Sequence, residues 1–112
     1  MNFEPQTSNL KLIAAMVQDQ DADELLGALI ETGFRATKIN TTGGFLRGSN
    51  NMILIGVEEE KVDQVLEVIK AHCHPRTQTV HPAHADYLVE PMTVTIGGAT
   101  VFVWDVERYE RL

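Results

Sequence analysis

The 112-residue sequence is poor in the features that cross-link or anchor a chain. It has one cysteine, so no internal disulfide can form, which fits a reducing compartment. Its apolar runs are broken by a charge or a glycine well before the roughly 20 residues that a membrane helix requires. The polar N-terminus lacks the basic start and apolar centre of a secretory signal. We therefore expect a cytoplasmic protein with no membrane partner.

Positive charge is also scarce, because the formal net charge is -7 and the pI is about 4.9. A surface this acidic repels phosphate backbones, which argues against a nucleic-acid partner. What is present is an ordinary globular composition, with 44% hydrophobic residues in a length that suits one core. We expect a flexible extension over residues 1–10 and a single domain over residues 11–112.

Aspartate and glutamate are missing from one long window, residues 32–57, which nevertheless contains Arg35, Lys38 and Arg47. An arginine can fork onto a phosphate, so this window could meet an anion locally on an otherwise acidic protein. The window also holds adjacent glycines and one phenyl ring. Two interpretations stay open here: a small site for an anionic ligand, or a solvated loop with Phe45 in the core.

If the window is a ligand site, its residue types divide the work by chemistry. Arg35 would bind a phosphate, and the amides of Gly43 and Gly44 could approach the ligand closely because no Cβ stands in the way. Phe45 would offer a face for base stacking. The side chains of Thr37 and Asn50 would supply donors and acceptors for a base edge or a ribose.

Hydrophobic patterning predicts two similar strand–helix–strand halves. Strands are expected at Lys11–Gln18, Arg35–Thr41 and Asn51–Val57, with a short one possible at Thr77–Val80 inside a long loop over residues 74–91. The first helix should start at an Asp21–Glu24 capping box and end at Gly33. The second should start at the acidic run of residues 58–60 and end before Pro75.

A final pair of strands is expected around Gly97 and Gly98. These glycines separate two β-rich runs, Met92–Ile96 and Ala99–Trp104, at the spacing of a two-residue hairpin turn. The register of that hairpin gives the pairs that should face the core: Ile96 with Ala99, Val94 with Val101, and Met92 with Val103. The fold class predicted is α+β, a ferredoxin-like βαββαβ sandwich with an extra C-terminal hairpin strand.

Metal chemistry and nucleophilic catalysis find little support in the sequence. Four histidines and Cys73 fall within residues 72–84, but they lack the paired short gaps of structural zinc sites. Cys73 continues the apolar stripe of the second predicted helix, so it is interpreted as a buried thiol with a packing role. We expect no metal and no catalytic nucleophile.

The glycine-rich segment could serve two kinds of phosphate chemistry. The TTGG run lacks the spacing of a phosphate-binding P-loop and does not open a helix. Enzymes that hydrolyse acyl phosphates on a ferredoxin-like fold use an arginine and an asparagine near a glycine-rich loop, and Arg35, Asn40 and Asn50 are candidates for those roles. Here the glycines follow a strand and do not precede a helix, which argues against that enzyme.

Four motifs give the sequence a specific resemblance. VQDQDA, FRATK, TTGGFL and IGGATVFV, within the segments Lys11–Cys73 and Met92–Tyr109, resemble the PII-like cyclic-di-AMP receptor family. The resemblance implies a PII-like homotrimer of ferredoxin-like subunits that binds cyclic di-AMP at clefts between subunits. It implies signal transduction through loop reordering toward an unknown downstream protein, with no catalysis and no cofactor besides the nucleotide.

The resemblance also implies site residues, position by position. Arg35 and Thr37 would contact the ligand through guanidinium and hydroxyl groups. The segment that holds an adenine and a phosphate would be Gly44, Phe45 and Leu46, beside Gly43. Asn50 and Gly56 would complete the wall.

Two departures from the family pattern bear on the ligand. The segment between Cys73 and Gly97 is several residues shorter than in typical relatives, a change that closure entropy permits. Arg111 stands where relatives carry a glutamine that helps to read the ligand. The alternatives to a cyclic-di-AMP receptor are therefore a PII-like protein that binds an adenine mononucleotide and a ligand-free structural or interaction scaffold.

Overall fold

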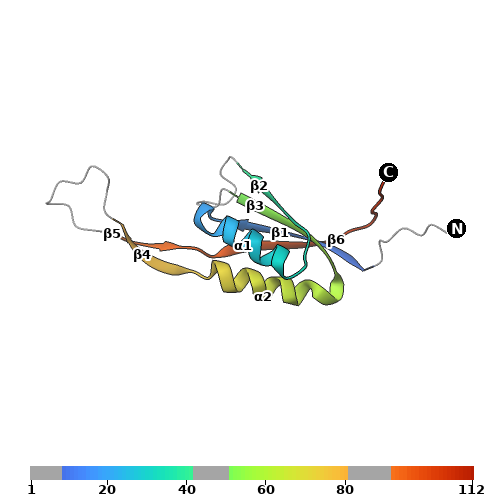
Figure 1. Cartoon of the computed structure of the whole chain (residues 1–112). Coiled ribbons are helices and arrows are strands. Elements are labelled where there is room, and N and C mark those ends of the chain that lie inside the picture. The colour runs from blue at the N-terminus through green and yellow to red at the C-terminus, as the bar shows by residue number, and fades with distance from the viewer. Residues whose placement is uncertain (1–8, 42–50, 81–91) are drawn as a thin grey trace.

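The computed structural model describes residues 9–41, 51–80 and 92–112 and is built on one antiparallel sheet with two helices on one face (Figure 1). From edge to edge, its strands are β2 (Ala36–Asn40), β3 (Asn51–Glu58), β1 (Leu10–Val17) and β6 (Ala99–Asp105). The helices are α1 (Asp19–Glu31) and α2 (Val62–Cys73), and one 3₁₀ turn, η1 (Glu59–Lys61), precedes α2. The predicted ferredoxin-like class is confirmed.

The core lies between the sheet and the helices. Alternation along β1 and β3 turns every second side chain toward the helices, and the register pairs Ile13 with Ile55 and Ala15 with Ile53. Leu25 on α1 meets this layer with no exposed surface. Further fully buried aliphatic side chains of the layer come from β1, α1 and α2: Val17, Leu29 and Val65. Burial of these side chains is the main stabilising contribution to the domain.

The other face of the same sheet carries no helix from the described residues, and we call it the open face. Its most exposed apolar side chains come from the two edge strands: Ile39 is 37% exposed, Phe102 36% and Trp104 49%. The rings of Phe102 and Trp104 stack with their centroids 6.0 Å apart. Between the two edge strands, Leu54 on β3 and Leu12 on β1 are partly exposed. The open face is therefore an apolar surface that extends across the sheet.

The prediction of a hairpin that joins Met92–Ile96 to Ala99–Trp104 through Gly97 and Gly98 is wrong. Strands β4 (Arg76–Val80) and β5 (Met92–Ile96) pair with each other and form a separate two-stranded ribbon, which we call the arm. β6 pairs instead with β1, so the expected facing pairs, including Ile96 with Ala99, do not form. The glycines have φ of 80° and 81° and make a corner between arm and sheet. Positive φ at two adjacent glycines suits either geometry.

The reason for the different pairing is tertiary. β6 covers the free edge of β1 over seven residue pairs, and β5 is paired with β4 in the arm. One of the predicted core positions agrees, because Val101 is partly buried against the core. Val103, predicted to be buried, is 44% exposed because it lies near the end of an edge strand.

Element ends follow the predictions with one exception. Gly33 ends α1 with φ of 99°, α2 ends before Pro75, and the possible strand over Thr77–Val80 is present as part of β4. The Asp21–Glu24 capping box is absent. α1 begins at Asp19, its N-cap residue Gln18 makes no side-chain cap, and Asp21 is committed to an ion pair elsewhere.

Candidate functional site

The predicted site residues divide between described and undescribed parts of the chain. Arg35, Thr37, Gly56 and Arg111 are described. The other five predicted site residues lie outside the described residues: Gly43, Gly44, Phe45, Leu46 and Asn50. Asn51 begins β3 immediately after this segment, so the described residues define both ends of the TTGG region.

Sheet register brings three of the predicted residues together. Thr37 on β2 faces Leu54 on β3, and the same antiparallel register, extended one residue beyond Ala36, places Arg35 opposite Gly56. Gly56 lies two residues from Leu54, and therefore on the same face as Thr37. All three predicted residues are exposed. The β2–β3 edge of the open face thus combines a guanidinium group, a hydroxyl group and one residue, Gly56, whose backbone no described side chain covers.

No described residue of the chain requires a glycine at position 56. Its φ is not positive, and a Cβ added there would meet no atom within 4 Å. A glycine in a strand interior weakens the strand, and one use of such a residue is close approach by a ligand or another backbone. The open space above Gly56 therefore fits an occupant from outside the chain.

The charges of the carboxylate-free window are not equivalent. Lys38 points to the helix side of the sheet, where its Nζ lies 2.6 Å from Asp23 Oδ1, and this hydrogen bond raises the pKa of Lys38. Arg35 makes no hydrogen bond or ion pair with the described residues. Among the described residues of this edge, the cation left available to an anionic ligand is therefore Arg35.

A buried amide fixes the point where the undescribed segment 42–50 rejoins the sheet. Asn51 is 1% exposed, and its Nδ2 donates to Asp19 Oδ1 at 2.9 Å. Sequence analysis missed this contact, although the VQDQDA motif contains its acceptor. Long-range pairing of an aspartate with an asparagine leaves no local pattern.

Arg111 belongs to a different part of the molecule. It follows β6, which is the edge strand opposite β2, and it is exposed. Arg111 lies six residues beyond the end of β6 and outside the sheet, so the strand register does not place it beside the β2–β3 residues.

Cys73 is the buried thiol that the sequence predicts. It is 2% exposed, and burial, with a further contribution from nearby Asp21, raises its pKa to about 11. A thiol is nucleophilic as its thiolate, so Cys73 is poorly suited to covalent chemistry near neutral pH.

The rival chemistries gain no support from the described residues. Within residues 9–41, 51–80 and 92–112, no group of three or more His, Cys, Asp or Glu side chains is placed to hold a metal ion. For the acyl-phosphate reaction, Arg35 and Asn40 stand at opposite ends of β2. Their odd separation of five residues turns them to opposite faces of an extended strand.

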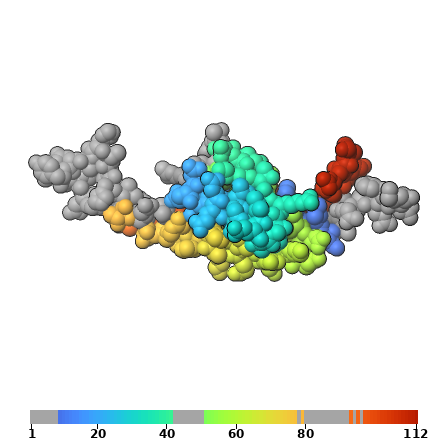
Figure 2. Space-filling view, in the orientation of Figure 1, coloured from blue at the N-terminus to red at the C-terminus, as the bar shows by residue number. Residues whose placement is uncertain are grey.

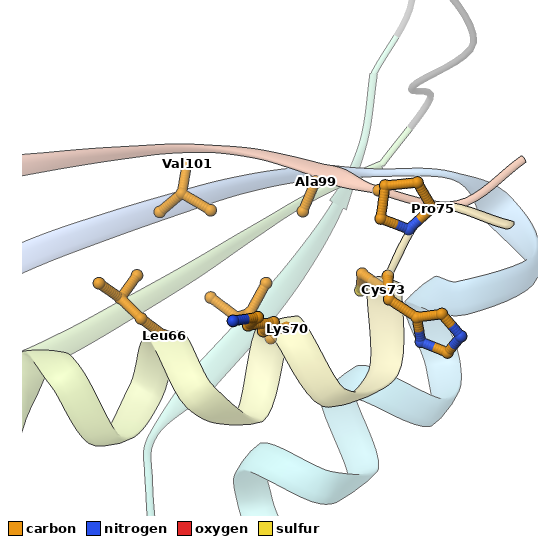
Figure 3. Close-up of a pocket in the computed structure, with 9 residues that line it drawn as sticks. Leu66, Lys70, Cys73, Pro75, Ala99 and Val101 are labelled. Atoms are coloured by element: carbon orange, nitrogen blue, oxygen red, sulfur yellow. The ribbon is translucent and has the colours of Figure 1, made fainter.

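A cavity of about 280 Å³ lies away from this edge, between α2 and β6 (Figure 3). Leu66, Cys73 and Val101 contribute to a mainly apolar lining, and Pro75 and Ala99 lie at the same groove. It contains none of the predicted site residues. The cavity therefore does not coincide with the β2–β3 edge.

Comparisons with solved structures identify the class of the fold. The crystal structure of a functionally unknown protein from Pediococcus pentosaceus is 44% identical, with a TM-score of 0.75 over 93% of this chain and 98% of that one. Arabidopsis thaliana PII bound to citrate is 19% identical, with a TM-score of 0.59 over 89% of this chain and 79% of that one. The fold is PII-like.

A family model gives the narrower assignment. The model of the cyclic-di-AMP receptor family matches residues 10–112, which includes every described strand and helix. This chain belongs to the cyclic-di-AMP receptor family. None of the helices in the described part of the chain combines the length and apolar character that crossing a bilayer demands.

Proposed function

We propose that this protein is a cytoplasmic, non-enzymatic signal transduction protein that binds cyclic di-AMP at clefts between the subunits of a homotrimer. Ligand binding then changes loop conformation and reports the nucleotide level to a downstream protein. The observation that carries the proposal is the family match over residues 10–112, because that family is one of receptors for this nucleotide.

The chemistry of the β2–β3 edge supports the ligand. Cyclic di-AMP carries two phosphate charges and two purine faces. Arg35 is available for a charge-assisted phosphate contact, and the exposed hydroxyl of Thr37 lies on the face that Gly56 leaves open. By the family resemblance, Gly43, Gly44, Phe45, Leu46 and Asn50 supply the remaining contacts around one adenine and one phosphate.

The open face supports the subunit arrangement. Phe102, Trp104 and Ile39 expose apolar surface on a sheet face that no described helix covers, and such patches mark association surfaces. Three open faces around one axis would cover one another. In that arrangement the C-terminal segment of a neighbouring subunit, with its Arg111, can complete a site whose other wall is the β2–β3 edge.

The test is isothermal titration of the purified protein with cyclic di-AMP. The wild type should bind about one ligand per subunit. Arg35→Ala should weaken binding by about thirtyfold or more, because losing one partner of a buried charge-assisted pair costs about 2 kcal/mol at least. The matched control is Lys61→Ala, which removes an exposed cation from η1 and should bind like the wild type.

Parallel titrations with AMP and ATP address the altered C-terminus. Arg111 carries a charge where relatives have a neutral glutamine, and this favours a second candidate, a sensor of a more highly charged adenine mononucleotide. Tighter binding of ATP than of cyclic di-AMP would replace the first proposal with the second. Folded trimeric protein that binds none of the three would leave the scaffold interpretation.

A further inference from the structure

The first turn of α1 contacts two segments that are far apart in the sequence. Asp19 accepts from Asn51 Nδ2 at 2.9 Å, and Asn51 is the first residue of β3. Two residues later, Asp21 Oδ1 accepts from Arg76 Nη2 at 2.8 Å, and Arg76 is the first residue of β4. One helical turn therefore holds both the end of segment 42–50 and the base of the arm.

The N-cap residue joins the same turn to the other strand of the arm. The amide of Gly97 donates to Gln18 Oε1 at 2.7 Å, at the corner between β5 and β6. Because its side chain is used there, Gln18 makes no side-chain cap on the helix. A first turn without a side-chain cap is prone to fraying, since most of its N–H groups lack partners within the helix; here the Asp21 N–H donates to the Gln18 carbonyl at 3.0 Å. Contacts with β3 and the arm therefore contribute to holding it wound.

The arm depends on these contacts in return. It projects away from the helices as a two-stranded ribbon (Figures 1 and 2), and such a ribbon is marginally stable alone in water. Its base is closely packed, because a Cβ added at Gly97 would lie 2.6 Å from both Arg76 Nη1 and the carbonyl oxygen of His74. Position and order of the arm are thus set largely at Arg76 and Gly97.

Burial makes the Asp21 contact sensitive to the state of the turn. The Asp21 side chain is 5% exposed, whereas that of Arg76 is 35% exposed. A buried carboxylate that loses its partner is strongly disfavoured. If the arm moves and Arg76 leaves, unwinding of the turn is the available way to return Asp21 to water. The turn then also withdraws Asp19 from Asn51.

We propose that residues 18–21, the first turn of α1, form a two-state element that couples the nucleotide-binding edge to the arm. Wound, the turn holds Asn51 and Arg76 together; unwound, it releases both. Anything that orders the start of β3 therefore orders the arm, and the reverse follows by linkage. The identity of the ligand that orders β3 rests on the proposed function, whereas the coupling itself is a property of the ligand-free chain.

The ligand-free test is amide hydrogen exchange on the full-length protein. Asp19→Ala, which removes the contact with β3, should speed exchange in the arm at Thr77 and Thr95 by about fivefold, the factor expected from one lost hydrogen bond. Arg76→Gln, which removes the contact with the arm, should speed exchange of the Asn51 and Met52 amides by a similar factor. Glu31→Ala, a charge-matched change at the other end of α1, should leave both regions unaltered.

The coupling is tested by whether each variant changes exchange on the far side of the turn as well as on its own side. If each variant speeds exchange only on its own side of the turn, the coupling is wrong. Gln18→Ala provides a milder break of the arm contact, so the reciprocal measurement stands even if Arg76→Gln does not fold.

The same measurement with cyclic di-AMP separates this inference from the function that it extends. In the wild type the ligand should slow exchange in the arm, and in Asp19→Ala the ligand should still bind while most of the slowing is lost. An undiminished arm response in Asp19→Ala contradicts the coupling. Absence of binding to the wild type contradicts the proposed ligand, and the ligand-free exchange still decides whether the turn couples β3 to the arm.

Discussion

The two faces of the four-stranded sheet are built from neighbouring residues and yet end in opposite environments. Ile55 points to the helices and has no exposed surface, whereas adjacent Leu54 points to the open face and is only partly covered. The helix-facing side of the sheet, which we call the covered face, has its apolar side chains buried by helices of the same chain. On the open face, the stacked rings of Phe102 and Trp104 are left partly exposed by the described residues.

The difference teaches which features of the sequence serve folding and which serve association. The core positions of β1 and β3 are explained by contacts with α1 and α2 alone. Gly56 and Trp104 on the open face have no such explanation among the described residues, because a Cβ at position 56 would meet none of their atoms within 4 Å and Trp104 is half exposed. Where contacts within one chain do not explain a residue, we assign it to subunit association or to ligand binding.

The largest expected effect comes from replacing the covered member of the β3 pair. Ile55→Ala should lower the free energy of unfolding by about 2 to 5 kcal/mol, through lost burial and the cavity left behind. Urea unfolding at several protein concentrations checks this value. The matched variant Leu54→Ala should lower the midpoint by an amount that depends on protein concentration, because the proposed partner surface of Leu54 belongs to another subunit. Equal, concentration-independent losses for both variants would remove the distinction between the faces.

A charge placed on the open face should separate the subunits without unfolding them. Trp104→Lys puts an ammonium group at the apolar surface, so sedimentation equilibrium should show monomers while far-UV circular dichroism stays like that of the wild type. The control is Ile30→Lys, at a residue of α1 that is 55% exposed, against 49% for Trp104. If both variants stay trimeric, or both dissociate, the open face is not the association surface.

The covered side also predicts a pH effect at Cys73. Its folded-state pKa of about 11 lies above the usual thiol value of about 8.5, so the native state disfavours the thiolate. The corresponding stability is fully present below the unfolded value and is lost as pH rises from there toward about 11.

Two measurements check this effect. Modification of the native protein by a thiol reagent should be slow near neutral pH, and alkaline urea midpoints should fall less for Cys73→Ala than for the wild type. Rapid modification of folded protein near neutral pH would contradict the assigned environment.

The smallest expected effect is at the exposed rim of the covered side. Asp23 and Lys38 are paired across α1 and β2 in contact with solvent, and pairs of this kind contribute little. Asp23→Ala should leave the unfolding midpoint and the affinity for cyclic di-AMP almost unchanged. A large loss of affinity in this variant would show that Lys38 belongs to the nucleotide site, contrary to the orientation described above.

Sequence patterns were most reliable where a local signal decides the structure. The apolar alternation of β3, the φ-positive stop at Gly33 and the acidic start before α2 are local, and all were predicted. The choice of partner for β6 is not local. The same Gly97-Gly98 dipeptide serves a hairpin turn or a corner, and the distant strands with which β5 and β6 pair, β4 and β1, determine which one forms.

The candidate site shows the same division. Residue chemistry and the family resemblance selected Arg35, Thr37 and Gly56, and the register of β2 with β3 then placed them on one edge. The contacts around the first turn of α1 were missed. Asp21 and Arg76 are 55 residues apart, and Asp19 and Asn51 are 32 apart, so neither pair leaves a periodic trace in the sequence.

Native mass spectrometry with cyclic di-AMP tests the central claim most directly, because one spectrum reports both the number of chains and the number of ligands. We expect a trimer that fills with three molecules of cyclic di-AMP, and an Arg35→Ala trimer that stays empty under the same conditions. A monomer in the spectrum, or a wild-type trimer that takes up none of the dinucleotide, would contradict a nucleotide site shared between open-faced subunits.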